Sequence, residues 1–355
     1  MPKNTTFFSK NLIVWYLQNG RTLPWRETRD PYKIWLSEIL LQQTRVAQGL
    51  PYYIKFIEAY PDVHKLAQTS EESVLKLWQG LGYYSRARNL HFTARYIVEQ
   101  YQGVFPDNYK DLLKLRGVGD YTASAIASIC FDEPAAVVDG NVYRVLSRIF
   151  GIATPINSTS GVKEFKKLAQ ILIDEDQPGT FNQAVMEFGA RYCVPKNPDC
   201  DRCIFSEKCL AFKMKKVNAL PVKINKTKVK QHYFNFIVPI SAEDTTILEQ
   251  RKGKGIWQNL YQFPLVESDS ELSLKELLKN ETYKNVSEKL KITSLTLYNS
   301  KTVLHKLSHK HLHTRFWIAE VDSIQEGSIK LSEIQTLPVP ILIGNFISEF
   351  SAFKD

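Results

Sequence analysis

Four of the five cysteines in this 355-residue chain fall within one short stretch, which constrains the fold more than any other feature. Their spacing is Cys-x6-Cys-x2-Cys-x5-Cys, formed by Cys193, Cys200, Cys203 and Cys209. Thiolates gather in this way to bind soft metal ions or iron–sulfur clusters. Structural zinc usually needs two close ligand pairs, and only one Cys-x2-Cys pair exists here. A metal-binding segment is expected, with zinc as an alternative, while Cys130 is expected to be a core thiol.

A glycine turn opens the stretch between Leu115 and Gly151. It consists of Gly117, Val118 and Gly119, and we expect a helix over Tyr121–Ser128 to follow, with Asp120 as its N-cap. Such a turn can leave backbone N–H groups at a helix start, where unpaired donors and the helix dipole favour a phosphate oxygen. The pattern indicates either a phosphate-binding turn or an ordinary tight turn.

A second helix is expected after Asp139, which follows the apolar run 135–138. This helix is amphipathic and ends at Gly151, a residue suited to the left-handed conformation after a helix. Taken alone, Asp139 is expected to be an ordinary N-cap.

An acidic residue, Glu38, lies within an otherwise apolar helix expected over Tyr32–Gln43. Ile34 precedes it by one turn and Leu41 follows by one turn, so Glu38 is expected on an apolar face. Burial raises the pKa of a carboxyl group, which suits a general acid near neutral pH. The alternative is a glutamate at the edge of the apolar stripe that points to water.

The segment Gly80–Arg88 combines glycines with aromatic and basic side chains, in the order GLGYYSRAR. This composition is typical of a loop that wedges into or stacks on unstacked DNA. The alternative is a pair of tyrosines packed under a helix, with arginines in solvent.

The whole chain is basic, with a formal net charge of +9, which favours a polyanionic partner. Hydrophobic residues make up 44% of the chain, so it is expected to be globular and to form two or three domains. It lacks an apolar run long enough for a membrane span, and its start lacks the core of a signal peptide. A cytoplasmic, nucleoid-associated protein without disulfides is therefore expected.

The pattern changes along the chain. Helical periodicity dominates up to about residue 212. The segment 213–230 holds seven lysines and no acidic residue, and it is expected to be an exposed linker. From about 231, short β segments are expected, with one helix near 270–279 and another near 342–352. His305, His309, His311 and His313 are expected on a polar strand or hairpin, without a metal.

These segments resemble the adenine DNA glycosylases of the MutY type. The resemblance rests on WLSEILLQQT around Glu38, on GLGYYSRARNL, on LRGVGDYTA with VDGN around Asp139, and on the cysteine spacing. It implies a mainly α N-terminal region with the helix-hairpin-helix glycosylase fold, followed by an α+β Nudix-like domain. The implied divisions are a catalytic region 1–212 (a six-helix barrel 26–135, and 1–25 with 136–212 as a [4Fe-4S] cluster domain), a linker 213–230, and a lesion-recognition domain 231–355.

The resemblance also implies roles for single residues. Glu38 and Asp139 would be the catalytic carboxylates, Tyr121 and Asn141 would help to position them, and the four clustered cysteines would hold the cluster. Ser308 and His309 would contact 8-oxoguanine, although Leu307 stands where relatives have Phe. No Nudix metal box is present, so nucleotide hydrolysis is not expected. The other implied DNA or substrate contacts are Arg26, Gln43, Thr44, Leu81, Tyr83, Arg86, Gly117, Val118, Gly119 and Gln183.

The implied reaction is monofunctional removal of adenine opposite 8-oxoguanine or guanine in duplex DNA, by a monomer that hands its product to downstream repair proteins. Glycosylase/lyases of the endonuclease III type are the nearest alternative, but they carry a lysine nucleophile where this chain has Tyr121. A catalytically silent iron–sulfur protein that senses lesions is the other alternative. It would need neither Glu38 nor Asp139.

Overall fold

The computed structural model describes residues 5–224 and 229–353, and these form two units. The first unit comprises residues 1–68 and 89–225, and the second comprises 69–88 and 226–355. The second unit therefore consists of the C-terminal domain together with residues 69–88 from the N-terminal half of the chain. Within the described ranges, no helix has the length and apolar character needed to span a membrane.

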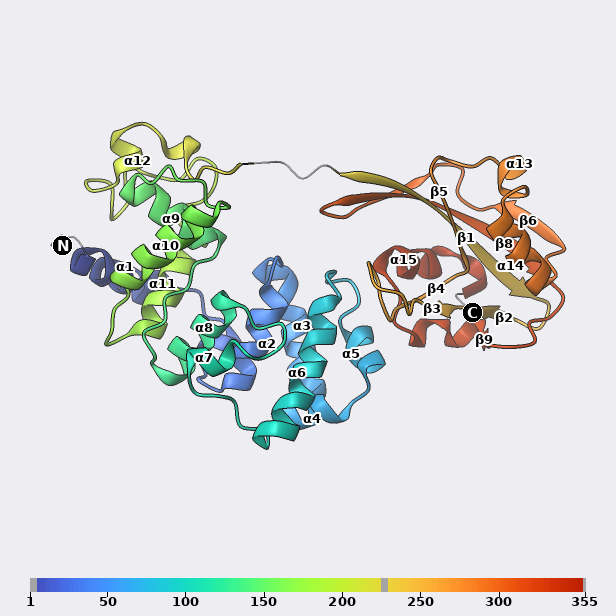
Figure 1. The fold of residues 1–355 in the computed structure, drawn as a ribbon, viewed down its shortest axis with the longest axis horizontal. Coiled ribbons are helices and arrows are strands. Elements are labelled where there is room, and N and C mark those ends of the chain that lie inside the picture. The colour runs from blue at the N-terminus through green and yellow to red at the C-terminus, as the bar shows by residue number, and fades with distance from the viewer. Residues whose placement is uncertain (1–4, 225–228, 354–355) are drawn as a thin grey trace. The chain divides into compact units, whose positions relative to one another are not determined.

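The first unit is helical throughout its described residues (Figure 1). Proline and capping residues set its helix starts: Pro31 opens α2, and the Asp30 side chain accepts a hydrogen bond from the backbone N–H of Tyr32. The helices are α1 (Thr5–Asn19), α2 (Pro31–Leu41), α3 (Val46–Ala59), α4 (Val63–Gln68), α6 (Ser85–Tyr101, of which residues 85–88 belong to the second unit), α7 (Tyr109–Leu112), α8 (Asp120–Phe131), α9 (Gly140–Phe150), α10 (Thr159–Leu172), α11 (Pro178–Arg191) and α12 (Leu210–Lys213), with 3-10 turns η1 (Pro24–Arg26) and η2 (Val217–Ala219).

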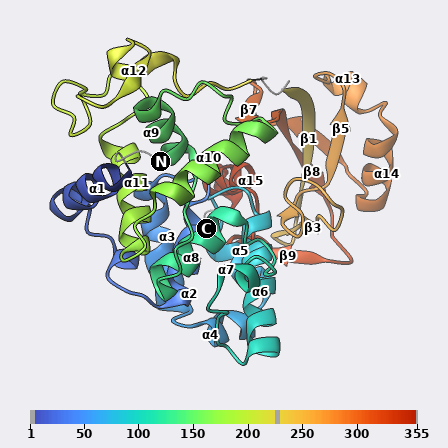
Figure 2. The same cartoon turned by 60° about the vertical axis from the view of Figure 1, so that its left-hand side comes forward.

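Helices α8, α9 and α11 pack closely, and α9 and α11 lie side by side in Figures 1 and 2. Two glycines of α11 allow this approach. A Cβ at Gly179 would stand 2.7 Å from the Ser128 carbonyl oxygen, and one at Gly189 would stand 2.7 Å from the Asn141 Cβ. A larger residue at either position would force the helices apart. The spacing at Gly189 matters for function because Asn141 stands next to Asp139 in the candidate site.

One capping assignment made from the sequence is wrong. Gly119, not Asp120, is the N-cap of α8, and Asp120 is its first residue. The reason is that the Asp120 carboxylate is used elsewhere. It accepts hydrogen bonds from the Tyr109 hydroxyl at 2.5 Å and from Lys166 Nζ at 2.9 Å, which ties the start of α8 to α7 and α10.

The basic segment after α12 was expected to be an exposed linker, and most of its residues between 213 and 224 are exposed, but a few backbone groups and Leu220 contact the rest of the first unit. The Arg148 Nε donates to the carbonyl oxygens of Val217 and Leu220, and Leu220 is buried. The Ile156 N–H also donates to the Val222 carbonyl oxygen at 2.9 Å. Lysine content alone did not reveal these contacts, because they use backbone carbonyl groups.

The second unit contains a mixed sheet in the order β5-β1-β8-β6, with β7 also paired to β8 (Figure 1). β1 and β8 are parallel, from the pair Lys230–Lys310 to the pair Ser241–Val321. The strands are β1 (Lys230–Ser241), β2 (Thr245–Ile247), β3 (Glu249–Gln250), β4 (Tyr261–Gln262), β5 (Leu265–Ser268), β6 (Ser294–Leu297), β7 (Val303–Lys306), β8 (Lys310–Val321) and β9 (Ser328–Lys330). The helical elements are α5 (Glu71–Leu77), α13 (Leu274–Leu277), α14 (Glu281–Leu290), η3 (Leu331–Thr336), α15 (Ile341–Glu349) and η4 (Ser351–Phe353).

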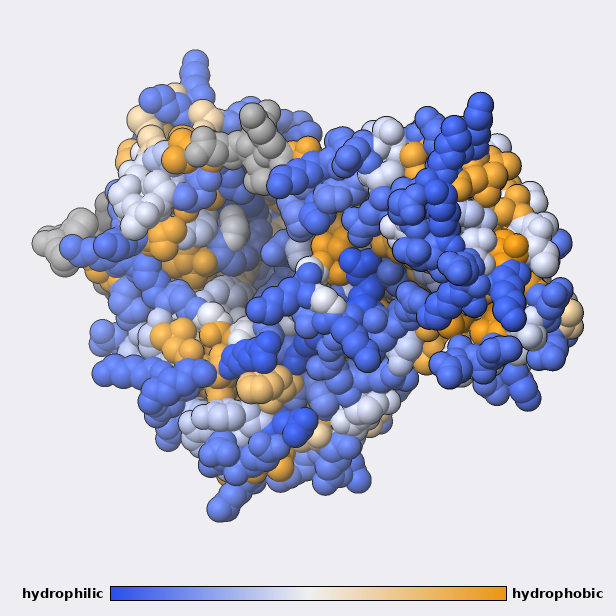
Figure 3. Space-filling model, turned by 45° about the vertical axis from the view of Figure 1, so that its right-hand side comes forward, coloured by the Kyte–Doolittle hydropathy of each residue, from blue (hydrophilic) through white to orange (hydrophobic). Residues whose placement is uncertain are grey.

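Aromatic stacking joins the sheet to the C-terminal helix. The ring of Phe316 on β8 lies 4.1 Å, centroid to centroid, from Phe346 on α15, and it also stacks on Phe236 of β1. Hydrophilic residues cover much of the face drawn in Figure 3, between separate apolar patches. The histidine-rich stretch forms a hairpin as expected: the Leu307 N–H donates to the Lys310 carbonyl oxygen between β7 and β8.

Candidate active site

One cavity in the first unit, of about 160 Å³, brings together seven of the residues singled out in the sequence. Glu38 comes from α2, Tyr121 from α8, Asp139 and Asn141 from the start of α9, and Gln183 from α11. The other two are Arg26 of η1 and Thr44. Residues more than a hundred positions apart therefore line a single pocket, and two of the seven, Glu38 and Asp139, carry carboxyl groups.

Glu38 is buried, with 8% of its surface exposed. Ile34 and Leu41 line the cavity with it, which confirms that it lies on an apolar face. Burial raises the pKa of Glu38 to about 7; the Asp139 charge acts in the same direction, and a hydrogen bond from Tyr121 opposes it. Near neutral pH this group is therefore present both as an acid and as its conjugate base.

Asp139 is the N-cap of α9, as the sequence indicated. Its Oδ1 accepts hydrogen bonds from the N–H groups of Asn141 at 2.9 Å and Val142 at 2.8 Å, and its Oδ2 accepts one from the Asn141 Nδ2 at 2.8 Å. Burial raises the pKa of Asp139, whereas these donors favour its ionised form. The capping hydrogen bonds therefore hold the Asp139 carboxylate in one orientation at the edge of the cavity that it lines.

Tyr121 provides a neutral hydroxyl near the two carboxyl groups. Burial, together with the neighbouring Glu38 and Asp139, raises its pKa well above the usual range, so it stays protonated. The hydroxyl lies within hydrogen-bonding reach of Glu38, and it is 3.0 Å from the Met186 Sδ. An amine at this position would be a nucleophile, and a phenol of raised pKa is not.

Two residues at this site were missed in the sequence: Glu187, which lines the cavity, and Tyr16, which contacts a lining residue. Glu187 on α11 has a fully buried side chain, and it accepts hydrogen bonds from Arg21 Nη2 at 2.6 Å and Arg26 Nη2 at 2.8 Å. Burial acts to raise the pKa of Glu187, but the two arginines outweigh it and lower the pKa to about 2. Tyr16 donates its hydroxyl to Gln183 Oε1 at 2.6 Å. The only signal in the sequence was Glu187 lying one turn after Gln183 in an apolar helix.

The loop before Asp139 is held by the buried side chain of Asn182. Its Oδ1 accepts from the Val137 N–H at 3.0 Å, and its Nδ2 donates to the Ala135 carbonyl oxygen at 2.8 Å. On the other side, Arg144 donates to Asn141 Oδ1 at 2.9 Å and to the Cys193 carbonyl oxygen at 2.8 Å. These bonds fix the backbone on both sides of the Asp139 carboxylate.

The four clustered cysteines line one small cavity with Arg148 and Phe188. The Arg148 Nη1 lies 3.5 Å from the Cys193 Sγ and also donates to the Val194 carbonyl oxygen. Among residues 5–224 and 229–353, no three Cys, His, Asp or Glu side chains come together as ligands of a single metal ion. Four thiols around one cavity, next to a guanidinium, are a donor set suited to a larger iron–sulfur group. Cys130 does not line this cavity.

The hairpin turn shows why a glycine stands at 117. Gly117 has φ +81°, and a Cβ there would lie 2.8 Å from the Asn89 Cβ. Val118 is buried and its N–H donates to the Leu115 carbonyl oxygen at 3.1 Å. The backbone N–H groups that remain free to bind an anion at the start of α8 are therefore those after Val118. At Gly119 an added Cβ would meet no atom within 4 Å, so space does not require a glycine there.

Three further predicted contacts lie outside the cavity. Gln43 has φ +56°, in the left-handed region, between α2 and the cavity residue Thr44. Ser308 and His309 are exposed at the β7–β8 turn of the second unit, and Ser308 Oγ lies 3.3 Å from His309 Nδ1. Leu307 is half-buried beside them.

The Gly80–Arg88 loop belongs to the second unit, and only part of it is exposed. Tyr83 has 46% of its surface exposed, whereas Leu81 and Tyr84 are buried. The Arg86 guanidinium is also buried and stacks over the Trp78 ring at 5.0 Å. Tyr83 is therefore the apolar side chain that this loop offers to a partner, and a wedge role for Leu81 requires it to leave its packing.

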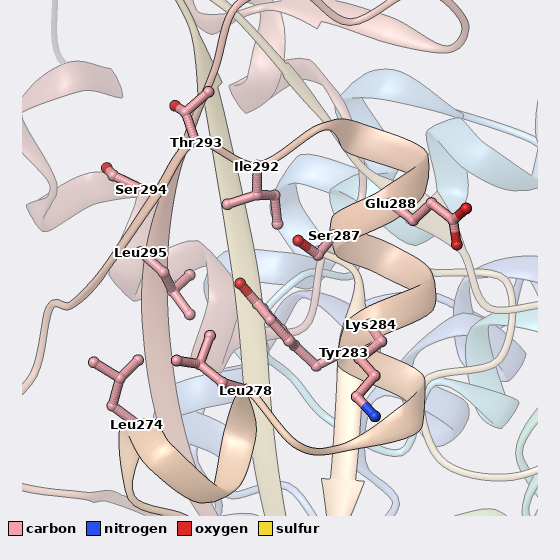
Figure 4. A pocket seen from close by; sticks show the side chains of 10 residues that line it. All are labelled: Leu274, Leu278, Tyr283, Lys284, Ser287, Glu288, Ile292, Thr293, Ser294 and Leu295. Atoms are coloured by element: carbon pink, nitrogen blue, oxygen red, sulfur yellow. The ribbon is translucent and has the colours of Figure 1, made fainter.

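A larger cavity, of about 630 Å³, lies between α13, α14 and β6 in the second unit (Figure 4). Leu274, Leu278 and Leu295 line it together with Lys284 and Glu288. It holds a single carboxylate and no buried acid–base pair. It is therefore not the candidate active site.

Comparison with known proteins agrees with this geometry. A family model described as "HhH-GPD superfamily base excision DNA repair protein" matches residues 36–170, and a NUDIX domain model matches residues 236–349. The adenine DNA glycosylase of Buchnera aphidicola subsp. Schizaphis graminum is 36% identical over 307 residues, which is 86% of this chain and 85% of that protein. The chain belongs to the adenine DNA glycosylase family.

Other known proteins match part of this chain. The adenine DNA glycosylase of Mus musculus is 45% identical over 218 residues, covering 59% of this chain and 42% of that protein. A solved thermostable thymine-DNA glycosylase matches with a TM-score of 0.56 and 33% identity, covering 60% of this chain and 98% of its own. An endonuclease III–DNA complex matches with a TM-score of 0.52 and 22% identity, covering 61% of this chain and 99% of that chain, which shows the fold alone.

Family membership confirms several expectations together. The chain is a DNA glycosylase of base excision repair, with a helix-hairpin-helix region followed by a Nudix-like domain. The silent-sensor alternative is therefore excluded. Adenine is the base named for its relatives.

Proposed function

We propose that the protein is a monofunctional glycosylase that hydrolyses the N-glycosidic bond of adenine paired with 8-oxoguanine or guanine. The observation that carries the proposal is one cavity lined both by Glu38, with a pKa of about 7, and by Asp139, whose carboxylate accepts three hydrogen bonds. The presence of Tyr121, rather than an amine, supports the monofunctional reaction.

The reaction begins with an adenine flipped out of the duplex, because its glycosidic bond cannot be reached in the stack. Protonated Glu38 gives its proton to the base at N7, which makes adenine a better leaving group. The C1′–N9 bond then breaks toward an oxocarbenium-like sugar, and Asp139 stabilises the positive charge. Glu38, now ionised, takes a proton from the attacking water. One carboxyl group thus acts as acid and then base while the other stays ionised, as in glycoside hydrolysis.

The polar side chains of Arg26 and Gln183, which line the same cavity as Glu38, give base selectivity in this proposal. Arg26 is held by the buried Glu187, and Gln183 is held by Tyr16, so both side chains have one fixed side and one that faces the cavity. Fixed donors and acceptors of this kind discriminate by leaving polar groups unpaired when the wrong base enters.

The four cysteines are proposed to hold a [4Fe-4S] cluster through Cys193, Cys200, Cys203 and Cys209. When bound, the cluster ties the 193–209 segment together. A fixed position of Cys193 would in turn hold the candidate site in place, because Arg144 donates hydrogen bonds both to the Cys193 carbonyl oxygen and to Asn141, which lies beside Asp139.

The DNA contacts proposed outside the cavity are the backbone of the 117–119 turn, the Tyr83 loop and the Ser308–His309 turn. A basic chain with net charge +9 supports a duplex DNA partner. The proposal takes the protein to act as a monomer and to hand its product to downstream repair proteins.

Borohydride trapping tests the monofunctional part of the proposal. Wild-type protein is mixed with a duplex containing adenine opposite 8-oxoguanine, and free adenine and covalent protein–DNA adduct are both quantified. We expect one adenine released per site without an adduct. Stoichiometric trapping by the wild type would show a Schiff-base nucleophile, and the reaction would then be that of a glycosylase/lyase.

A further inference from the structure

Within the second unit, side-chain hydrogen bonds join the segment before the Gly80–Arg88 loop to the C-terminal domain. The Asn259 Nδ2 donates to Glu71 Oε1 at 2.6 Å, and the Tyr261 hydroxyl donates to Glu72 Oε2 at 3.1 Å. Both acceptors lie in the first turn of α5. The C-terminal domain therefore holds the start of the short helix that leads into the Gly80–Arg88 loop.

Further contacts hold the far end of the same segment. The Lys76 Nζ donates to the Leu337 carbonyl oxygen at 3.1 Å, and the Val339 N–H donates to Gln79 Oε1 at 3.3 Å. Beyond the loop, the Arg88 Nη1 donates to the Gln258 carbonyl oxygen at 3.0 Å. The loop is thus bracketed on both sides by bonds to one domain.

The loop itself is internally braced, so a displacement of its ends moves it as a body. The Trp78 Nε1 donates to the Gly82 carbonyl oxygen at 3.0 Å, and the Arg86 Nη2 lies 3.3 Å from the same oxygen. Tyr83, with φ +46°, projects from this braced turn and is its exposed aromatic ring. An exposed ring on a rigid turn is suited to enter a base step.

The segment that fastens the loop also contacts the strand that leads to the Ser308–His309 turn. The Trp257 ring lies 6.0 Å from the His305 ring of β7, and β7 runs directly into this turn. Trp257 and Asn259 both have positive φ, at 61° and 65°, so the backbone between them has a tightly defined shape. One short segment, 257–261, is therefore packed against the lesion-reading strand and bonded to the helix that carries the Tyr83 loop.

We infer that segment 257–261 is a latch that positions the Tyr83 loop relative to the Ser308–His309 turn. Asn259 and Tyr261 are positioning residues that raise selectivity for adenine opposite the oxidised guanine. When the Ser308–His309 turn binds 8-oxoguanine, Tyr83 is placed for insertion beside the target adenine. An unmodified guanine does not bind the turn in this way and does not place Tyr83. This inference rests on the proposed function, because it assigns lesion reading to the C-terminal domain.

The substitution Asn259→Asp tests the latch. It preserves shape and suits a left-handed backbone, but it sets a second carboxylate against Glu71 where a donor stood. We expect the ratio of single-turnover adenine release opposite 8-oxoguanine to that opposite guanine to fall about tenfold, as for directly coupled neighbours. Release opposite guanine should be unchanged. The fluorescence of 2-aminopurine next to the target adenine should report slower base opening only in the 8-oxoguanine duplex.

Glu71→Gln is the matched control and the rescue. Alone it keeps an oxygen that accepts from Asn259, so the ratio should stay as in the wild type. Combined with Asn259→Asp it supplies an amide donor to the new carboxylate, and the ratio should recover. Tyr261→Phe should lower the ratio by removing one bond without adding charge.

Two results would overturn the latch. Equal loss of release in both duplexes, with no rescue by Glu71→Gln, would mean that Asn259 only supports folding, and an unchanged ratio in Asn259→Asp would mean that the bond has no role. Wild-type protein that releases no adenine from either duplex would instead refute the proposed function.

Discussion

The substitution Glu38→Gln measures how much burial of this carboxyl group lowers the free energy of unfolding, independently of the role of Glu38 in the reaction. Burial raises the pKa of Glu38 from 4.5 to about 7. That shift corresponds to about 3 kcal/mol, since one pKa unit is worth about 1.4 kcal/mol. Glutamine has the same shape and no charge. The unfolding free energy of the variant should therefore lack the pH-dependent loss that ionisation of Glu38 causes in the wild type.

The sign follows from proton linkage. Below pH 4.5 both the folded and the unfolded chain hold the Glu38 proton, so the group adds no pH dependence. Between pH 4.5 and 7 only the unfolded chain loses it, and the wild type loses stability as the pH rises. Above pH 7 the loss is complete. Relative to the wild type, the Glu38→Gln variant should gain about 3 kcal/mol in unfolding free energy between acidic and alkaline pH.

Urea unfolding at pH 4.5 and pH 8.5, followed by circular dichroism, measures this difference. Comparing the two pH values for each protein cancels any constant effect of the amide. Glu58→Gln is the matched control, because Glu58 is an exposed glutamate in α3 of the same unit. If Glu38→Gln changes stability by the same amount at both pH values, Glu38 does not have the raised pKa on which the mechanism depends.

Four other outcomes follow from the site. The single-turnover rate of adenine release by the wild type should fall about tenfold per pH unit above pH 7, because the reaction requires the protonated form of Glu38. Asp139→Asn should keep α9 capped and DNA bound while release is lost, as measured by gel shift and adenine release, since Asn is an equally good cap. Glu187→Gln should destabilise the first unit by about 2 kcal/mol in thermal unfolding, because the half-buried guanidinium groups of Arg21 and Arg26 lose the charged acceptor that they share. Cys200→Ser should lower bound iron and visible absorbance, and retention of both would contradict the proposed cluster.

The sequence predicted best where local chemistry decides the outcome. Asp139 caps α9 and Gly151 ends it with φ +68°, because each of these roles depends on one residue and its nearest neighbours. The burial of Glu38 followed from helical spacing. The gathering of the cavity residues could not be derived from spacing and came instead from the family resemblance.

What was missed depends on contacts between distant segments. Glu187 becomes the partner of Arg26 only after α11 packs beside η1, and nothing in the local pattern indicates that pairing. The assignment of 69–88 to the second unit depends on bonds such as Asn259 to Glu71, almost two hundred residues apart. Helix α14 was missed because its polar surface hides the apolar positions at Tyr283 and Leu290.

Single-turnover adenine release from duplexes with adenine opposite 8-oxoguanine, guanine or thymine tests the central claim most directly. Wild-type protein and Glu38→Gln are compared in parallel, with binding measured on the same duplexes. The account predicts fast release opposite 8-oxoguanine, slower release opposite guanine, none opposite thymine, and none from the variant. Release by Glu38→Gln at the wild-type rate, or equal release from all three duplexes, would contradict it.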